Sequence, residues 1–440
     1  MTAPEPEPVS VSAPAIGSWQ ETGNADFPPR RHGNHRRRGM DGMSVLYDPN
    51  DPALAADRFA YYKRLRETDP VHQISTGYWL LTRYDDVEAL LRSPHSSSAF
   101  PKEPGWAMSR GGPTCPAMRS VSKWLLLQDG AEHRRLRKLI ARVFTPRYID
   151  RLRPRIGEIV DGLLDAMGEG EVDLIRDLAL PMPVAVVGEL LGIPVEDRAR
   201  CRDWTDKVGY ILDPEVTPRR RIAMNKAEPE FRAYLLDLMA SRRDADPDND
   251  LLSVLMTAED NEQLTEEEVV ANILLIFNAG HETTVNLIGN GMLALLRQPE
   301  ALEALRADPG LMTTAVDELA RFDPPVTLSS RIATAEMEFG GKVIPPGSHV
   351  IGFLDAAGRD PERYRDPDRL DLARTEPKTL AFSAGPHFCL GAVLGRLEAA
   401  TVFSKLLERY SRIELLREDL PVNNHFNLHG LLELPLRLSR

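Results

Sequence analysis

A glycine-rich segment near the C-terminus, FSAGPHFCLG at 382–391, holds the residue with the clearest chemical role, Cys389. Apolar residues recur at helical spacing from Leu394 to Leu407, so Cys389 is predicted to stand where a helix begins. The dipole and free N–H groups of a helix start favour the thiolate, which is the form of cysteine that binds metal. A lone buried cysteine is more often an inert core residue. Here the glycines would let the backbone approach a flat cofactor, and Phe382 would cover it.

A long helix is predicted upstream of this segment. Thr265 and the three glutamates that follow it form a capping box, which marks a helix start. Apolar residues then recur at helical spacing as far as Arg297, and Pro299 stops the pattern. At 1.5 Å per residue this helix would be about 50 Å long. It could therefore cross the whole molecule.

Polar and flexible residues interrupt the middle of this helix, where the sequence reads AGHETT at 279–284. Glycine costs up to about 1 kcal/mol inside a helix, and Thr283 can return its hydroxyl group to the carbonyl of Ala279, which bends the helix. We expect a local groove with the Thr283 hydroxyl and the Glu282 carboxylate at its edge. A packing notch against another helix is the competing interpretation.

Glu318 and Arg321 lie three residues apart, so they share one helix face just before Pro324. Such pairs are common on exposed faces, where each is worth only a few tenths of a kcal/mol. Taken alone, this one is an ordinary surface pair. Its position in the sequence, between the polar helix centre and the cysteine segment, makes a functional interpretation worth considering.

The sequence pattern around these residues predicts a mainly α (α+β) fold. From Tyr47 onward the pattern is mostly helical, with short strands expected near 71–81 and 335–353. There is no alternation of strands and helices and no glycine-rich phosphate loop, so nucleotide binding has little support. Two stretches rich in Pro, Gly or Ser, 93–120 and 212–218, are expected to be irregular.

Residues 1–43 are predicted to be a disordered tail that precedes a single catalytic domain at 44–440. They are rich in Pro, Ser, Glu and Arg and show no helical or strand period. The run RRHGNHRRR at 30–38 could be an address or an anion-binding arm, but such charge blocks are usually solvated tails. Met40 and Met43 are candidate true starts.

Composition narrows the function further. The formal net charge of −12 opposes nucleic acid as the main partner, because phosphate binding needs a concentrated basic surface. The three cysteines are far apart and odd in number, which indicates neither a disulfide framework nor a zinc cluster and fits a reducing cytoplasm. No apolar run has signal-peptide length or approaches the roughly 20 residues needed to cross a bilayer. We expect a soluble, cytoplasmic protein.

The order of these motifs resembles the cytochrome P450 family: a central acid–alcohol pair, a Glu-x-x-Arg, and a Phe-x-x-Gly-x-His-x-Cys-x-Gly loop near the C-terminus. The resemblance covers about 47–440, including RDP at 359–361 and DPDR at 366–369. Two residues depart from the family pattern. Ser383 stands where the family usually has Gly, and Gly358 stands where many bacterial members have Asn. Both departures put local loop geometry in doubt.

The resemblance implies a helical body with a small β-rich region around a buried haem b, with Cys389 as the axial thiolate ligand of the iron. The other residues that it assigns to haem binding are His133, Arg137, Arg331, His387, Ala279, Gly280 and Phe382. Thr283 and Glu282 match the residues that deliver protons during oxygen activation. Glu318, Arg321 and Arg369 would form a buried network behind the haem, which is sensible only as a fully paired set.

The implied activity is the insertion of one oxygen atom from O₂ into a bulky apolar small molecule, by a hydroxylase or epoxidase that tailors a bacterial secondary metabolite. An oxidative coupling enzyme and a catalytically silent haem-binding partner protein are the alternatives. The chain has no flavin or iron-sulfur signature, so its electrons would come from a ferredoxin and a ferredoxin reductase. The expected docking site is a basic segment, although it could be an ordinary solvated helix face. Its members are Arg134, Arg135, Lys138, Arg142 and Arg147.

Overall fold

The structure, a computed structural model, describes residues 47, 51, 53–54, 57–242, 250–260, 263–374, 378–423 and 427–440. The predicted tail at 1–43 lies outside these ranges and stays a prediction.

Helices dominate the described residues, as the sequence predicts. They are α2 (Arg58–Thr68), α3 (Tyr84–Arg92), α4 (Pro104–Ser109), α5 (Pro116–Val121), α6 (Gly130–Ile140), α7 (Pro146–Met167), α8 (Pro181–Leu191), α9 (Arg198–Gly209), α10 (Pro218–Ser241), α11 (Leu251–Asp260), α12 (Glu266–Leu296), α13 (Pro299–Ala307), α14 (Met312–Phe322), α15 (Leu354–Ala357) and α16 (Ala392–Arg409). No helix in these ranges is long and apolar enough to cross a membrane.

The strands form three small sheets. Their bounds are β1 (Val71–Gln73), β2 (Trp79–Leu81), β3 (Ser96–Ser97), β4 (Gly170–Asp173), β5 (Leu328–Ala333), β6 (Met337–Phe339), β7 (Lys342–Ile344), β8 (His349–Phe353), β9 (Arg412–Leu415) and β10 (Pro435–Ser439). The largest sheet has the order β1-β2-β8-β5-β3, the second has the order β4-β10-β9, and β6 pairs with β7. The two strand regions expected from the sequence therefore contain β1, β2, β6, β7 and β8.

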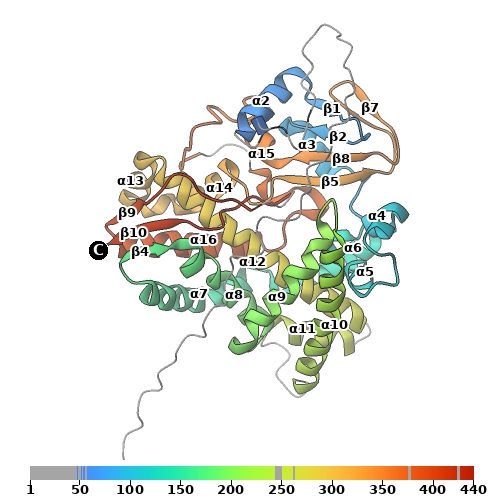
Figure 1. The fold of residues 1–440 in the computed structure, drawn as a ribbon, viewed down its shortest axis with the longest axis horizontal. Helices are drawn as coiled ribbons and strands as arrows, with labels where there is room; N and C mark the ends of the chain where they lie inside the picture. Colours follow the sequence, from blue (N-terminus) through green and yellow to red (C-terminus); the bar gives the residue numbers. More distant parts are fainter. Residues whose placement is uncertain are drawn as a thin grey trace, which may run out of the picture. The chain divides into compact units, whose positions relative to one another are not determined.

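Helix α12 is the predicted long helix and packs against α8, α9, α14 and α16 (Figure 1). Thr265 caps it, and the capping box with Glu268 is present. Its 31 residues span about 46 Å. Most of them are buried, but Ala279 is exposed and Thr283 only half-buried. The interruption in the apolar pattern is thus an interruption in the packing.

The stretch 93–120 is less irregular than its composition predicts, because it contains β3, α4 and α5. Both helices begin with a proline, Pro104 and Pro116. Proline at the first helical position needs no N–H partner and has a suitable φ angle. Proline marks helix starts here as well as turns. In 212–218 only the last residue, Pro218, starts a helix, and 213–217 have no regular structure.

Candidate functional site

The cysteine segment is a closed loop that leads into α16. The backbone N–H of Cys389 donates to the carbonyl of Phe382 at 2.8 Å. The guanidinium of Arg396 lies 4.0 Å from the centre of the Phe382 ring. Gly385 has a φ of +67°, and a Cβ atom at this position would lie 2.6 Å from the backbone oxygen of Leu91. A glycine is therefore required where the loop meets the end of α3.

Ser383, the first departure from the family pattern, is strained. Its φ of +63° and ψ of −171° lie in a region that is essentially restricted to glycine. Its hydroxyl oxygen is also buried without a hydrogen-bond partner in the described part of the chain. The loop thus keeps the backbone geometry that glycine would adopt, and the backbone of Ser383 is strained as a result.

Replacing Ser383 with glycine should raise the free energy of unfolding by about 1 kcal/mol. Relief of the strain is worth 1–3 kcal/mol, and the added freedom of the unfolded chain returns part of that, roughly 0.4–1 kcal/mol. Chemical denaturation of the two haem-loaded proteins followed by circular dichroism measures the difference. A variant that is no more stable than the parent would show that Ser383 is unstrained.

The N–H groups at the helix start favour the Cys389 thiolate, as the sequence predicts, but burial opposes them. Burial raises the pKa of Cys389, and this outweighs the opposing effects of the N–H groups of Gly391 and Ala392 and of the cations Arg396 and Arg137. The helix start alone therefore does not produce a thiolate. Binding to a metal cation would, because a metal stabilises the deprotonated ligand directly.

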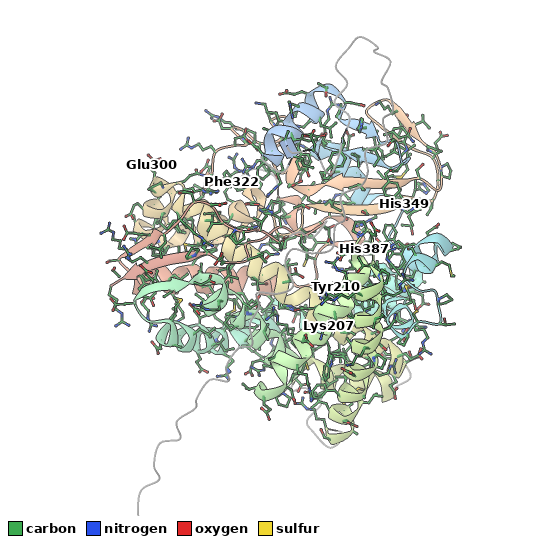
Figure 2. All side chains as sticks on the ribbon, in the orientation of Figure 1. Lys207, Tyr210, Glu300, Phe322, His349 and His387 are labelled. Carbon is green, nitrogen blue, oxygen red and sulfur yellow. The ribbon has the colours of Figure 1, made fainter. Side chains whose placement is uncertain are left out.

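Four of the predicted haem-binding residues form one cluster beside this loop. The rings of His133 and His387 lie 4.2 Å apart, and Figure 2 labels His387. Arg137 donates from Nη2 to the carbonyl of Phe388 at 2.7 Å. Arg331, on β5, is close enough to lower the pKa of His387, although burial lowers it more. The sequence positions 133, 137, 331 and 387 thus meet in space.

Asp129, the N-cap residue of α6, belongs to the same cluster and was missed in the sequence. Its carboxylate lies 3.4 Å from Nε2 of His387 and accepts hydrogen bonds from Ser97 and from the backbone N–H of Ser98. Burial alone would raise the pKa of Asp129, but the hydrogen bond with His387 and those from Ser97 and Ser98 hold it well below its usual range. An acidic residue before a helix is so common as a cap that it gave no distinct signal.

Two polar groups of the cluster fit an anionic cofactor such as a haem with its propionates. His133 is 3% exposed, and its Nε2 has no hydrogen-bond partner among the described residues. Burial lowers the pKa of Arg331 to about 10, although the nearby Asp129 carboxylate opposes this. Among the described residues, its guanidinium donates to Ser329 Oγ and to the carbonyl of Ser330, both at 2.7 Å. A buried guanidinium without a bonded carboxylate normally requires a counter-ion.

The centre of α12 carries the remaining predicted site residues. Thr283 Oγ1 donates to the carbonyl of Ala279 at 2.9 Å, as the sequence predicts. Gly280 faces α8, since a Cβ there would lie 3.4 Å from Val187. Ala279 is exposed on an otherwise buried helix, and Cys389 has an accessible side chain although burial dominates its pKa. Both residues therefore present accessible atoms, as a cofactor-binding position requires.

Helices α12 and α16 are joined beside this region. Thr284, which follows Thr283, has its Oγ1 3.0 Å from Oε2 of Glu398 on α16. A Cβ added at Gly395, also on α16, would lie 3.9 Å from the same Thr284 oxygen. Glu282 is half-buried on α12. The polar centre of α12 therefore lies against the helix that follows Cys389.

Glu318 and Arg321 form a buried ion pair and not a surface pair. Both side chains are 2% exposed, and Arg321 Nε lies 2.6 Å from Glu318 Oε2. Arg321 also donates to the carbonyls of Gly358 and Pro367 at 2.6 and 2.9 Å. Every charged atom of the pair is thus compensated.

The third side chain of this network differs from the expected one. Arg369 is exposed and contributes only its backbone carbonyl, 3.3 Å from Arg321 Nη2. The second guanidinium that contacts Glu318 belongs to Arg374, whose Nε lies 3.1 Å from Oε2. The chain folds back between these two arginines, so the residue five positions later reaches the carboxylate.

Gly358, the second departure, lies beside the same network. A Cβ at this position would come within 2.8 Å of the carbonyl oxygen of Arg321. An asparagine here would therefore require the backbone to shift. The glycine matches the close approach of α15 to the end of α14.

The basic segment, which runs from α6 into the start of α7, is partly as expected. Arg134, Lys138, Arg142 and Arg147 are exposed and have no ion pair with another described residue. Arg135 is different, because it pairs with Glu132 at 2.7 Å and with Glu268. Two exposed apolar side chains lie in and just after the cysteine loop, Phe388 at 37% and Val393 at 39%.

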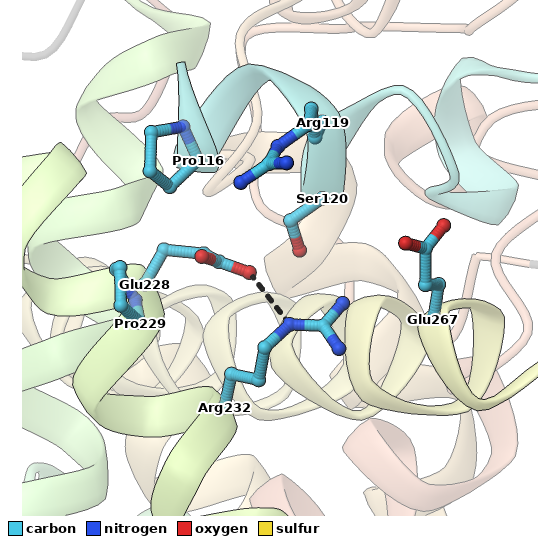
Figure 3. A pocket seen from close by; sticks show the side chains of 7 residues that line it. All are labelled: Pro116, Arg119, Ser120, Glu228, Pro229, Arg232 and Glu267. Carbon is cyan, nitrogen blue, oxygen red and sulfur yellow. Dashed lines mark ion pairs between the residues drawn. The ribbon is translucent and has the colours of Figure 1, made fainter. Parts of the chain in front are cut away.

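A cavity of about 270 Å³ lies elsewhere, between α5, α10 and the start of α12 (Figure 3). It is lined by Pro116, Arg119, Ser120, Glu228, Pro229, Arg232 and Glu267. Arg232 and Glu228 face each other there, with Nε and Oε1 3.6 Å apart. None of the predicted site residues lines this cavity, so it is separate from the candidate site.

Comparisons with known proteins agree with this geometry. The family model described as "Cytochrome P450" matches residues 210–309 and 310–439. The chain is 40% identical to Cytochrome P450 107B1 of Saccharopolyspora erythraea over 410 residues, covering 88% of this chain and 96% of that protein. It is 41% identical to Cytochrome P450 monooxygenase PikC of Streptomyces venezuelae, covering 88% and 92%. The crystal structure of CalO2 matches with a TM-score of 0.85 and 30% identity, covering 90% of this chain and 99% of that one.

Proposed function

Because the chain belongs to the cytochrome P450 family, whose members bind haem iron through a cysteine thiolate, we propose that Cys389 is that ligand and that the haem is haem b. The observation that carries the proposal is the cluster of His133, Arg137, Arg331 and His387 beside the accessible thiol. These four side chains would hold the two propionates. Phe382 would cover the proximal face, and Ala279 and Gly280 the distal one.

The protein is a monooxygenase, and we propose that its substrate is a bulky apolar small molecule from secondary metabolism. When bound, the haem supplies the activation of O₂, and one oxygen atom enters the substrate. Conversion of a candidate substrate under isotopically labelled O₂ tests this. Product that carries one labelled oxygen atom supports insertion, whereas unlabelled coupled product would indicate an oxidative coupling enzyme instead.

Thr283 and Glu282 would deliver protons during this reaction. Because Thr283 donates its hydroxyl proton to the Ala279 carbonyl, its lone pairs remain free to accept a hydrogen bond in the groove. The half-buried Glu282 carboxyl can exchange protons with solvent and pass them inward. The pair thus combines a fixed hydroxyl with a mobile proton source.

Replacing Thr283 with alanine should keep haem and substrate binding but divert reducing equivalents to hydrogen peroxide or excess water. The substitution removes the hydroxyl group and its hydrogen bond to the Ala279 carbonyl. Product formed per reductant consumed should fall several-fold, and Thr283→Ser, which keeps the hydroxyl, should stay near the parent. If the alanine variant remains as well coupled as the parent, Thr283 has no role in proton delivery.

We propose that the electron donor is a ferredoxin, itself reduced by a ferredoxin reductase, and that the protein is cytoplasmic. The four free cations on and after α6 would attract an acidic ferredoxin, and Phe388 and Val393 would provide apolar contact. Arg135 is not part of this proposed docking surface, because its charge is already paired with Glu132 and Glu268.

Reversing two of these charges, Arg134→Glu with Arg142→Glu, should slow ferredoxin-driven reduction at low salt by at least tenfold. Steered association is sensitive to charge and is screened beyond about 8 Å at physiological ionic strength, so the defect should shrink as salt rises. Reduction by dithionite should not change. The matched control, Lys63→Glu with Arg64→Glu on α2, changes the net charge equally. If both double variants are slowed alike, the donor does not dock on α6.

A further inference from the structure

Glu398 is a buried carboxyl group with one hydrogen-bond contact among the described residues. It lies on α16, nine positions after Cys389, and is 2% exposed. Its Oε2 is 3.0 Å from Oγ1 of Thr284, whose neighbour in the chain is Thr283. The proton-delivery scheme above does not use it.

The number of protons available decides how these groups bond. Thr284 Oγ1 lies between Glu398 Oε2 at 3.0 Å and the carbonyl of Gly280 at 3.4 Å. A hydroxyl group has one proton to donate. If the carboxyl group is protonated, it donates to Thr284, and Thr284 donates to Gly280. If it is ionised, Thr284 must donate to Glu398, and its bond to Gly280 is lost.

The surroundings of Glu398 favour the protonated form. The cations of α16 are committed elsewhere: Arg396 pairs with Asp317 on α14, while Lys405 and Arg409 pair with Asp161 and Asp165 on α7. Toward α12, the contact is the neutral Thr284. Burial raises the pKa of Glu398 to about 8, and the hydrogen bond with Thr284 opposes this only in part.

We propose that Glu398 is a positioning residue that stays protonated in the working enzyme and, through Thr284, holds the Gly280 carbonyl and thus the polar centre of α12 in place. The inference builds on the proposed function, because that centre carries Glu282 and Thr283. Two hydroxyl groups then donate hydrogen bonds to successive carbonyls of the AGHETT segment. Thr283 donates to Ala279, and Thr284 donates to Gly280.

The charge state can be read from stability as a function of pH. A carboxyl group that ionises near 4.5 when unfolded and near 8 when folded makes the protein less stable as the pH rises between those values. The folding equilibrium should therefore move by up to tenfold per pH unit in this window, relative to a variant without the carboxyl group. Glu398→Gln is that variant, since its amide N–H can donate to Thr284 at every pH.

The experiment compares haem-loaded parent, Glu398→Gln and Glu398→Leu. Infrared difference spectra at pH 7 should contain the carbonyl band of a protonated carboxyl group in the parent and not in Glu398→Gln. The glutamine variant should keep the coupling of reductant to product near that of the parent. The leucine variant, which cannot donate to Thr284, should lose coupling several-fold. Glu398→Gln should also gain stability on the parent between pH 4.5 and 8.

A missing infrared band, or a glutamine variant as poorly coupled as the leucine variant, would show that Glu398 is ionised and would overturn the proposal. The infrared and stability readouts do not depend on the identity of the iron ligand. A protein that shows both pH signatures but lacks a thiolate-type carbonyl spectrum would therefore reject the proposed function and leave the role of Glu398 standing.

Discussion

Replacing Cys389 with histidine should abolish the thiolate-specific absorption of the reduced carbonyl complex and remove monooxygenase activity. The thiolate pushes electron density onto the iron and favours O–O cleavage, whereas a neutral imidazole does not. The variant should still fold, because Cys389 has an accessible side chain and its backbone N–H, which closes the loop onto Phe382, is kept. The absorption spectrum of the reduced, carbonylated protein measures the change.

The two other cysteines are the controls. Cys201 is buried with its pKa raised to about 12 by burial, so it stays a thiol. Cys115 is half-buried and lies 3.0 Å from the Gly111 carbonyl. Cys115→Ser should leave the spectrum as it is in the parent. A thiolate-type band that survives in Cys389→His would mean that the iron ligand is a different residue.

The second large effect is expected at Glu318. Glu318→Gln should lower the free energy of unfolding by about 3–5 kcal/mol, because it leaves buried guanidinium charge without compensation. The carboxylate accepts from Arg321 at 2.6 Å, from Arg374 at 3.1 Å and from the backbone N–H of Asp371 at 2.8 Å. Domains are stable by only about 5–15 kcal/mol in total, so haem-loaded protein should be obtained in poor yield.

Asp150→Asn is the matched control for this change. Asp150 and Arg153 are also three residues apart on one helix and 3.0 Å apart, but their side chains are 63% and 62% exposed. Asp150→Asn should therefore lower the free energy of unfolding by less than about 1 kcal/mol. Chemical denaturation followed by circular dichroism gives both numbers. Equal losses in the two variants would mean that the Glu318 network adds nothing through burial.

The sequence predicts those features that depend on neighbouring residues. The start and end of α12 follow from a capping box and a proline, and the Thr283 hydrogen bond joins residues four apart. The positions of His133 and His387 came only from the family resemblance. Composition misled for 93–120, where prolines begin α4 and α5.

The features that the sequence does not predict depend on tertiary packing. Arg374 meets Glu318 across 56 residues, and Glu398 meets Thr284 across 114. In each case the partner is one of many similar side chains, and only the folded chain selects it. Strands β9 and β10 were not expected either, and β10 pairs with the distant β4 as well as with β9.

Under the proposed function, helix α6 carries two sets of residues on different faces, one for cofactor binding and one for partner docking. Its inward positions carry His133 and Arg137, while Arg134 and Lys138, each the next residue along, point to solvent. A helix is about 10–12 Å across with its side chains. The residues proposed to bind the cofactor are therefore separated from those proposed to contact the electron donor. Donor preference can therefore be redesigned at the outer positions while the inner ones are left untouched, and one such enzyme could be adapted to foreign reductases by surface mutation alone.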